Sequence, residues 1–493
     1  MNKSRYLKNL ATSMVPIGLS IVSGFLVPPF LTRRFGMEYF GLWNLLNSII
    51  GLTALGGLGI DTALSFFLKE NSEVVFAKRM LRYGRLITRV TGAILTILLA
   101  VFILSGWGKS LTKLSIDGST QSLITLYLAI GWAILALQFL PVQGALIGLG
   151  KMYLENIFRG LVSGLPVLVI VFVAIFNLNF LTFVVLSFVS LFIVNLGRFF
   201  ALKRCLNSKK NSSEVDSPAA SIGFVQVTKK SFGFFLAGAG ILVIQNVDGF
   251  VIAGIRSLKE VAEFGLAFRL ISLIFGVVMT LNNSLYTEVR ADRGNLPVYQ
   301  HAWKVALAVS VVALLGTSLF IRDFMDIWLG RTIGLSDGTL VLMVVYGFLF
   351  TFVNLNTVFA NALGASKILA GISAIEAVLH VLLVVIFTKL FGIIGVPLGS
   401  IVAVSFSPYI LTRFRLNHYD ESLDKSGMKK MLGVEIVILT TASLVGFLTI
   451  LFFNNFYFKG VLVICSGSLV AFVLRKDLVA QFRRRKQLRQ DSL

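Results

Sequence analysis

Charged, cysteine and histidine side chains are scarce in this sequence. Only 14% of its 493 residues are charged, whereas 56% are hydrophobic. About a quarter of the residues of an ordinary soluble domain are charged, so this composition excludes that class. Two cysteines, Cys205 and Cys465, and three histidines are too few for a disulfide framework or a cysteine-based metal site. We therefore expect no metal and no cofactor.

Two further patterns are missing from the chain. No Walker A sequence is present, so ATP is not expected to be the direct source of energy. No segment alternates apolar and polar residues over about ten positions, as the strands of a membrane β-barrel do. These absences leave a helical membrane protein as the class to test.

Long apolar runs follow one another along the whole chain. An α-helix needs roughly 20 apolar residues to cross the hydrocarbon core of a bilayer. The sequence thus predicts an all-α polytopic membrane protein with about 14 transmembrane helices. The expected spans are 10–31, 39–68, 86–106, 122–147, 154–176, 180–202, 231–255, 264–286, 302–321, 339–363, 370–388, 393–411, 432–453 and 461–474.

The basic residues indicate the orientation of these spans. Most of the 45 lysines and arginines lie between spans on the side that bears both termini. Because basic loops stay in the cytoplasm, both termini are predicted to be cytoplasmic. The net charge of +22 then reflects orientation in the membrane, and we expect no nucleic-acid partner.

Short motifs recur in the two halves of the chain. Residues 40–42 (FGL) match 264–266, and 148–151 (GLGK) correspond to 364–367 (GASK). Six spans separate the copies, so both begin on the same membrane face, and two six-helix lobes would be related by a parallel pseudo-two-fold axis. The expected divisions are an N-terminal lobe at 1–202, a cytoplasmic linker at 203–228, a C-terminal lobe at 229–416, a linker with accessory helices 13 and 14 at 417–474, and a basic cytoplasmic tail at 475–493.

Segments 31–42, 58–64 and 247–270, together with the Gly-x-x-Lys turns, resemble one family of transporters. They are similar to the polysaccharide transporter branch, of O-antigen flippase type, within the multidrug/oligosaccharidyl-lipid/polysaccharide exporter superfamily. The resemblance implies a non-enzymatic flippase in the bacterial inner membrane, working by alternating access in lipopolysaccharide biosynthesis. Its cargo would be an oligosaccharide on undecaprenyl diphosphate, and its partners membrane lipid and other proteins of polysaccharide assembly.

Arg269 and Asp248 are the strongest site candidates, because each is an ionisable residue well inside an apolar run. A guanidinium can hold a diphosphate through paired hydrogen bonds. The alternative is an ion pair between Arg269 and Asp248. Asp248 could also bind a coupling cation or proton.

Other polar residues of the spans are weaker candidates. Asp61 follows several glycines that would loosen its helix and free backbone groups beside a cavity, although it could equally cap or tether that helix. Glu376 and His380 lie four residues apart, so they share a helix face and could relay protons. Amides suit sugar hydroxyls but also form interhelical hydrogen bonds. The amide candidates for binding substrate are Asn44, Gln138, Asn282, Asn283 and Asn354.

Two other functions remain open. A cation-coupled drug antiporter of the same superfamily should have an acidic cavity, whereas the most central charge here is Arg269. A membrane polysaccharide polymerase or ligase should carry a large periplasmic loop with catalytic residues. The outer loops expected here are short.

Overall fold

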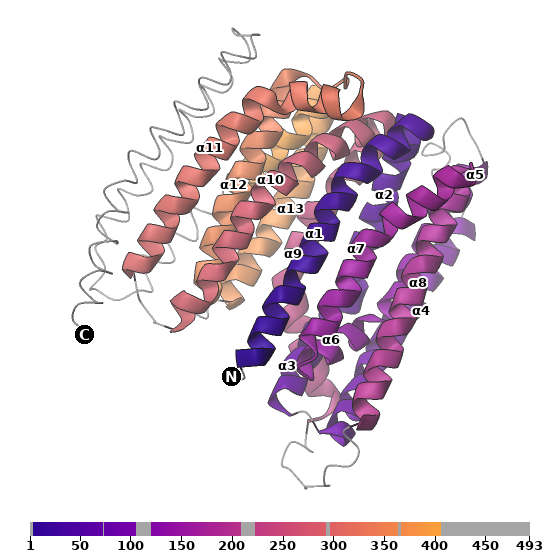
Figure 1. Cartoon of the computed structure of the whole chain (residues 1–493), viewed down its shortest axis with the longest axis vertical. Coiled ribbons are helices and arrows are strands. Elements are labelled where there is room, and N and C mark those ends of the chain that lie inside the picture. The colour runs from indigo at the N-terminus through magenta and orange to yellow at the C-terminus, as the bar shows by residue number, and fades with distance from the viewer. Residues whose placement is uncertain are drawn as a thin grey trace. The chain divides into compact units, whose positions relative to one another are not determined.

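A computed structural model of the chain describes residues 3–71, 73–104, 120–208, 222–291, 296–362 and 366–405. All regular structure in these ranges is helical, as Figure 1 shows. The expected accessory helices and tail, at 417–474 and 475–493, lie outside the described residues. The middle of the expected linker, 209–221, also lies outside them.

The helices follow the expected spans closely. In chain order they are α1 (Lys3–Arg34), α2 (Met37–Thr53), η1 (Ala54–Gly57), α3 (Ile60–Glu70), α4 (Val74–Leu104), α5 (Thr120–Leu137), α6 (Leu140–Gly148), α7 (Met152–Ile175), α8 (Phe180–Ser208), α9 (Phe224–Ile255), α10 (Leu258–Ala291), α11 (Leu296–Leu329), α12 (Asp337–Ala362), α13 (Ser366–Phe391) and η5 (Gly392–Ile394). Helical backbone continues from 395 to 405.

The chain divides into two compact units, Met1–Gly265 and Leu266–Leu493. The division falls inside α10, so the first unit holds α1 to α9 and the start of α10. Within this unit α1 lies along α7, and α3 packs on α6 (Figure 1). The expected linker at 203–228 overlaps two helices, because α8 continues to Ser208 and α9 begins at Phe224. The lobes at 1–202 and 229–416 stay a proposal.

The expected span 39–68 is broken into α2, η1 and α3. Leu58 and Gly59 adopt left-handed backbone angles at the break, with φ of 47° and 70°. A Cβ on Gly59 would lie 2.7 Å from the backbone nitrogen of Phe235, so α9 packs directly on the break. The hydroxyl of Ser231 in α9 donates to the carbonyl of Leu58 at 2.5 Å. The Leu58 carbonyl is thus engaged, and the expectation of free backbone groups beside a cavity stays a prediction.

The expected span 122–147 is also two helices, α5 and α6. Pro141 stands in the first turn of α6, where its missing N–H costs nothing and its fixed φ favours a helix start. A Cβ on Gly144 would clash with the carbonyl oxygen of Asp61, so only glycine allows α6 to approach α3 this closely.

Local sequence also sets where helices begin. The sequence 257–260 (SLKE) has the pattern of a capping box, and the amide of Glu260 makes one of its two bonds by donating to the hydroxyl of Ser257 at 3.2 Å. Arg256 pairs with the carboxylate of Glu260 at 3.0 Å, and this hydrogen bond and charge raise the pKa of Arg256. The amide of Thr339 likewise donates to Ser336 at the start of α12.

Many large apolar side chains face outward from the helices, as expected where lipid is the solvent. Ile97 in α4 and Ile193 in α8 are both 62% exposed. Among the described residues, seven helical segments are long and apolar enough to cross a membrane. They are Met14–Arg34, Met37–Gly57, Thr120–Gly148, Met152–Ile175, Phe180–Ser208, Gly238–Ile255 and Leu369–Ser405.

Candidate functional site

Aromatic rings from three helices meet in the second unit. The ring of Tyr346 in α12 stacks on Phe268 of α10, with 6.4 Å between centroids. The same tyrosine ring lies 6.5 Å from His380 of α13 and 6.1 Å from Phe350. We call these four residues the aromatic cluster. His380 is only 1% exposed, so this cluster joins α10, α12 and α13 inside the unit.

Besides His380, the helices that form the aromatic cluster carry three sequence-predicted residues whose side chains are described. Arg269 follows Phe268 directly and is partly buried. Asn354 lies two turns beyond Tyr346 on α12, and its side-chain oxygen is buried without a hydrogen-bond partner among the described residues. Glu376 is 7% exposed and precedes His380 by one turn, so the pair shares a face of α13, as the spacing predicts.

Residues of these types would suit a polar, anionic molecule. A guanidinium offers five donors in a planar fork, which matches the oxygens of a diphosphate. Aromatic faces give apolar contact area, and a buried amide oxygen gains most from a polar partner because an unpaired one costs free energy. The sequence analysis did not identify Tyr346 as a site candidate. The signal that could have found it was its spacing of eight residues from Asn354.

Helices α2 and α9 of the first unit carry a second group of predicted residues. Asp248 is buried on α9, and the neighbouring Gly249 approaches Ser48 of α2, whose hydroxyl would lie 3.1 Å from a Cβ there. Asn44 lies one turn before Ser48, and its amide nitrogen is buried without a hydrogen-bond partner among the described residues. A Cβ on Gly265 would clash with that nitrogen. Small residues thus let polar side chains enter this interface.

Some expected relations are not tested by the described structure. Asp248 lies in the first unit and Arg269 in the second, so the ion pair expected between them stays a prediction. Asn282 and Asn283 lie on α10, but their side chains are outside the described part of the chain.

Asp61 and Gln138 are two further sequence-predicted residues, and both lie in the first unit. Asp61 is in the first turn of α3, where an acidic side chain interacts favourably with the helix dipole. The amide of Gln138 donates to the carbonyl of Thr88 in α4 at 2.9 Å, and the Thr88 hydroxyl lies 3.3 Å from the Gln138 side-chain oxygen. Gln138 therefore forms the interhelical bonds that were the alternative to contact with substrate.

A buried charge network in the first unit was not predicted. Glu155 of α7 is 1% exposed and Arg198 of α8 is 4% exposed, and they pair at 3.1 Å. Arg198 also donates to Asn195 at 2.7 Å, while the half-exposed Arg159 donates to Glu155 at 3.2 Å. We call these four residues the α7–α8 charge network. Its only sequence signals were the spacings 155/159 and 195/198 at the ends of apolar runs.

The described residues contain no group of three or more His, Cys, Asp or Glu side chains that could hold a metal ion.

No protein-family model matches the chain, and no curated protein matches it by sequence. Solved structures do match. The lipid II flippase MurJ, in an inward closed conformation, has a TM-score of 0.68 at 13% identity, covering 95% of this chain and 100% of MurJ. An inward-facing MATE family multidrug resistance transporter of the MOP superfamily has a TM-score of 0.56 at 15% identity, covering 83% of this chain and 100% of its own.

A third match is the MATE multidrug transporter DinF-BH, with a TM-score of 0.53 at 15% identity. It covers 84% of this chain and 96% of DinF-BH. At these identities the likeness establishes the fold. The predicted class, an all-α polytopic membrane protein, is confirmed, and the fold is that of the MurJ and MATE transporters.

Proposed function

We propose that this protein is a flippase that carries an undecaprenyl-diphosphate-linked oligosaccharide, an O-antigen or similar repeat unit, from the cytoplasmic to the periplasmic leaflet of the bacterial inner membrane. Two lobes at 1–202 and 229–416 would give alternating access, with both termini in the cytoplasm. Sugars and phosphates cannot cross hydrocarbon alone, because each unsatisfied polar group there costs several kcal/mol. A transporter with the fold of the lipid II flippase would remove that barrier while the polyprenyl tail stays in lipid.

One observation supports an anionic cargo: Arg269 lies in an apolar stretch of α10, next in sequence to Phe268 of the aromatic cluster. A fixed cation favours a diphosphate and opposes a cationic drug. Asn354 is then a candidate donor and acceptor for sugar hydroxyls, as are Asn44, Asn282 and Asn283. In this proposal Glu376 and His380, which share a face of α13, would be the residues that couple transport to protons.

A cation-coupled antiporter for drugs or other small molecules is the second candidate. Two observations favour it: the fold shared with MATE transporters, and the buried carboxylates of Asp248 and Glu376. Buried acids inside membrane helices commonly bind cations or relay protons. Non-enzymatic transport is common to both candidates, and the sign of the cargo separates them.

The test is a pair of substitutions, Arg269→Ala and Arg269→Lys, assayed by surface polysaccharide in cells that lack their native flippase. If Arg269 binds the diphosphate, both variants should reach the membrane at normal levels and both should lose transport, since lysine lacks the paired planar donors. Arg256→Ala is the matched control, because Arg256 is 43% exposed and pairs only with Glu260 among the described residues.

Each other outcome identifies a different role. A silent Arg269→Lys, with Arg269→Ala partly rescued by Asp248→Asn, would show that Arg269 serves only as an ion-pair partner. Full activity of Arg269→Ala at normal expression would contradict the proposed cargo site. Proton-dependent export of cationic dyes without polysaccharide transport would establish the antiporter instead.

A further inference from the structure

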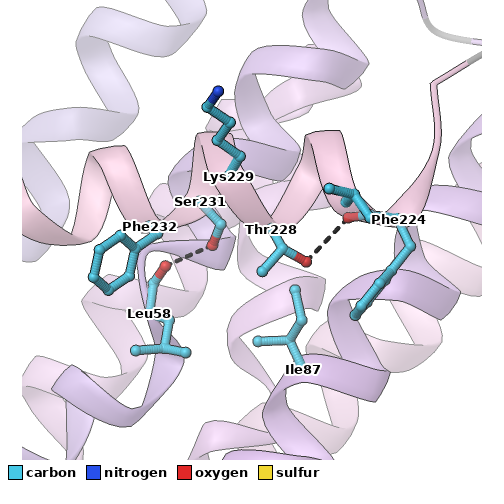
Figure 2. A pocket seen from close by; sticks show the side chains of 8 residues that line it. Leu58, Ile87, Phe224, Thr228, Lys229, Ser231 and Phe232 are labelled. Atoms are coloured by element: carbon cyan, nitrogen blue, oxygen red, sulfur yellow. Dashed lines mark hydrogen bonds between the residues drawn. The ribbon is translucent and has the colours of Figure 1, made fainter.

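A pocket of about 340 Å³ lies in the first unit, where α9 crosses the break between η1 and α3. Leu58 at the break and Ile87 of α4 form one wall, and the first turns of α9 form the other (Figure 2). The ring of Phe224 packs edge-on against Tyr83 of α4 at 5.6 Å and closes one end. Its volume is at the lower end of the range for ligand pockets.

The polar groups that line this pocket are already engaged, with one exception. The hydroxyl of Thr228 donates to the carbonyl of Phe224 at 3.0 Å, and Ser231 donates to Leu58. Both bonds are drawn in Figure 2. The pocket therefore presents an apolar interior, which suits a hydrocarbon chain and offers little to a sugar.

Lys229 is the exception. In Figure 2 its ammonium group points away from Leu58 and Ile87, toward the outside of the pocket. No hydrogen bond or ion pair engages it among the described residues, and it is exposed. Lys230 differs, because its ammonium group lies 4.4 Å from the ring centre of Phe66 and is held there by a cation–π interaction.

The position of Lys229 along α9 indicates the level of the lipid headgroups. It lies two residues before position 231, where the expected span begins, and nine residues before Gly238, where the apolar membrane segment of α9 begins. Neighbouring apolar side chains face outward, with Val225 76% exposed and Phe232 49% exposed. A lysine at the end of a span, with its stem along apolar surface, places its charge at the membrane surface. Each such base attracts anionic lipid by about 1 kcal/mol.

From these contacts we propose that the pocket binds an anionic membrane phospholipid, with part of an acyl chain against Leu58 and Ile87 and the headgroup phosphate on Lys229. The apolar interior, the exposed cation at its rim and the interfacial depth all select an amphiphile of negative charge. Arg269 does not line this site, so the lipid test and the Arg269 test can fail separately.

The test uses the full chain in vesicles of equal phosphatidylglycerol and phosphatidylcholine with identical acyl chains. Val225 at the rim is replaced by the photoreactive residue p-benzoylphenylalanine, and its lipid adducts are measured by mass spectrometry. This readout is local, so lipid bound elsewhere on a chain of net charge +22 does not contribute. Phosphatidylglycerol adducts should exceed phosphatidylcholine adducts.

Three variants in this background separate headgroup from chain. Lys229→Ala should lower the adduct ratio about fivefold, which corresponds to about 1 kcal/mol for one base. Lys203→Ala, an exposed lysine at the end of α8, should leave it unchanged. Thr228→Phe fills the pocket and should reduce both adducts, since the Thr228 hydroxyl bonds only to its own helix.

Any of three results would overturn the proposal. The first is an adduct ratio equal to the bulk lipid ratio when Val225 is the only residue replaced. The second is an adduct ratio that Lys229→Ala leaves unchanged. The third is undiminished adducts in Thr228→Phe. The thermal midpoint of each variant, measured in detergent, shows whether it is folded.

Discussion

Replacing Arg198 by methionine removes one partner of the α7–α8 charge network while keeping a side chain of similar length. The change leaves the carboxylate of Glu155, which is 1% exposed, with only the half-exposed Arg159 as a charged partner among the described residues. It also removes the bond from Arg198 to Asn195. The carboxylate would then be a buried charge without adequate compensation.

The magnitude follows from burial. Removing one partner of a buried pair costs about 3–5 kcal/mol, whereas an exposed pair contributes about 0–1 kcal/mol. Because Arg159 remains, we expect about 3 kcal/mol for Arg198→Met and at most about 1 kcal/mol for Arg159→Ala. Neutralising both partners, in Glu155→Gln with Arg198→Met, should restore most of the loss, since a buried pair can be replaced by neutral groups at little cost.

Thermal unfolding of the purified protein in detergent measures these differences. A unit of this size shifts its midpoint by about 2–4 °C per kcal/mol, so Arg198→Met should unfold at least about 6 °C lower, and Arg159→Ala no more than about 4 °C lower. The double variant should unfold above either single variant of the pair, as in a double-mutant cycle. A double variant no more stable than Arg198→Met would refute the reasoning, because the loss would then come from packing and not from a stranded charge.

Two further predictions concern contacts between helices of the first unit. Gly41→Ala should lower the free energy of unfolding by about 1–3 kcal/mol, because its Cβ would clash with the carbonyl oxygen of Leu258. Gly18→Ala is the control, since nothing lies within 4 Å of the new Cβ. Equal thermal midpoints for the two variants would contradict the close approach of α2 to Leu258. Gln138→Leu should lower the unfolding free energy by about 0.6–1.7 kcal/mol, the range for interhelical hydrogen bonds in membranes, with transport retained. If transport is lost while the midpoint is unchanged, Gln138 binds cargo instead of Thr88.

Interfaces made by small residues connect these predictions. Gly41, Gly144 and Gly265 each let a helix approach another backbone or amide to a distance that a Cβ would prevent. Among these, Gly41 and Gly265 belong to the two copies of the FGL motif that suggested the repeat. The glycine of each copy of the FGL motif therefore has a packing role in the first unit, and this role does not depend on how the lobes are related.

The sequence by itself determined the features that depend on local backbone and solvent. Helices satisfy their own hydrogen bonds, so apolar length located most of the described spans, although 39–68 and 122–147 are each broken into shorter helices. The shared face of Glu376 and His380 followed from helix periodicity. These features need no knowledge of which helices are neighbours.

Only the tertiary structure decided which side chains meet. The Ser231 hydroxyl donates to the carbonyl of Leu58, although 173 positions separate the two residues in sequence. Arg198 pairs with Glu155, which is 43 positions away. Tyr346 gathers His380 and Phe268 from two other helices. Such pairings depend on how helix surfaces pack, and in an apolar environment packing is driven by close contact of small residues more than by a pattern of hydrophobicity. Hydrophobic periodicity along the sequence does not indicate which helix surfaces pack together. The α7–α8 charge network and the aromatic cluster could therefore be identified only from the tertiary structure.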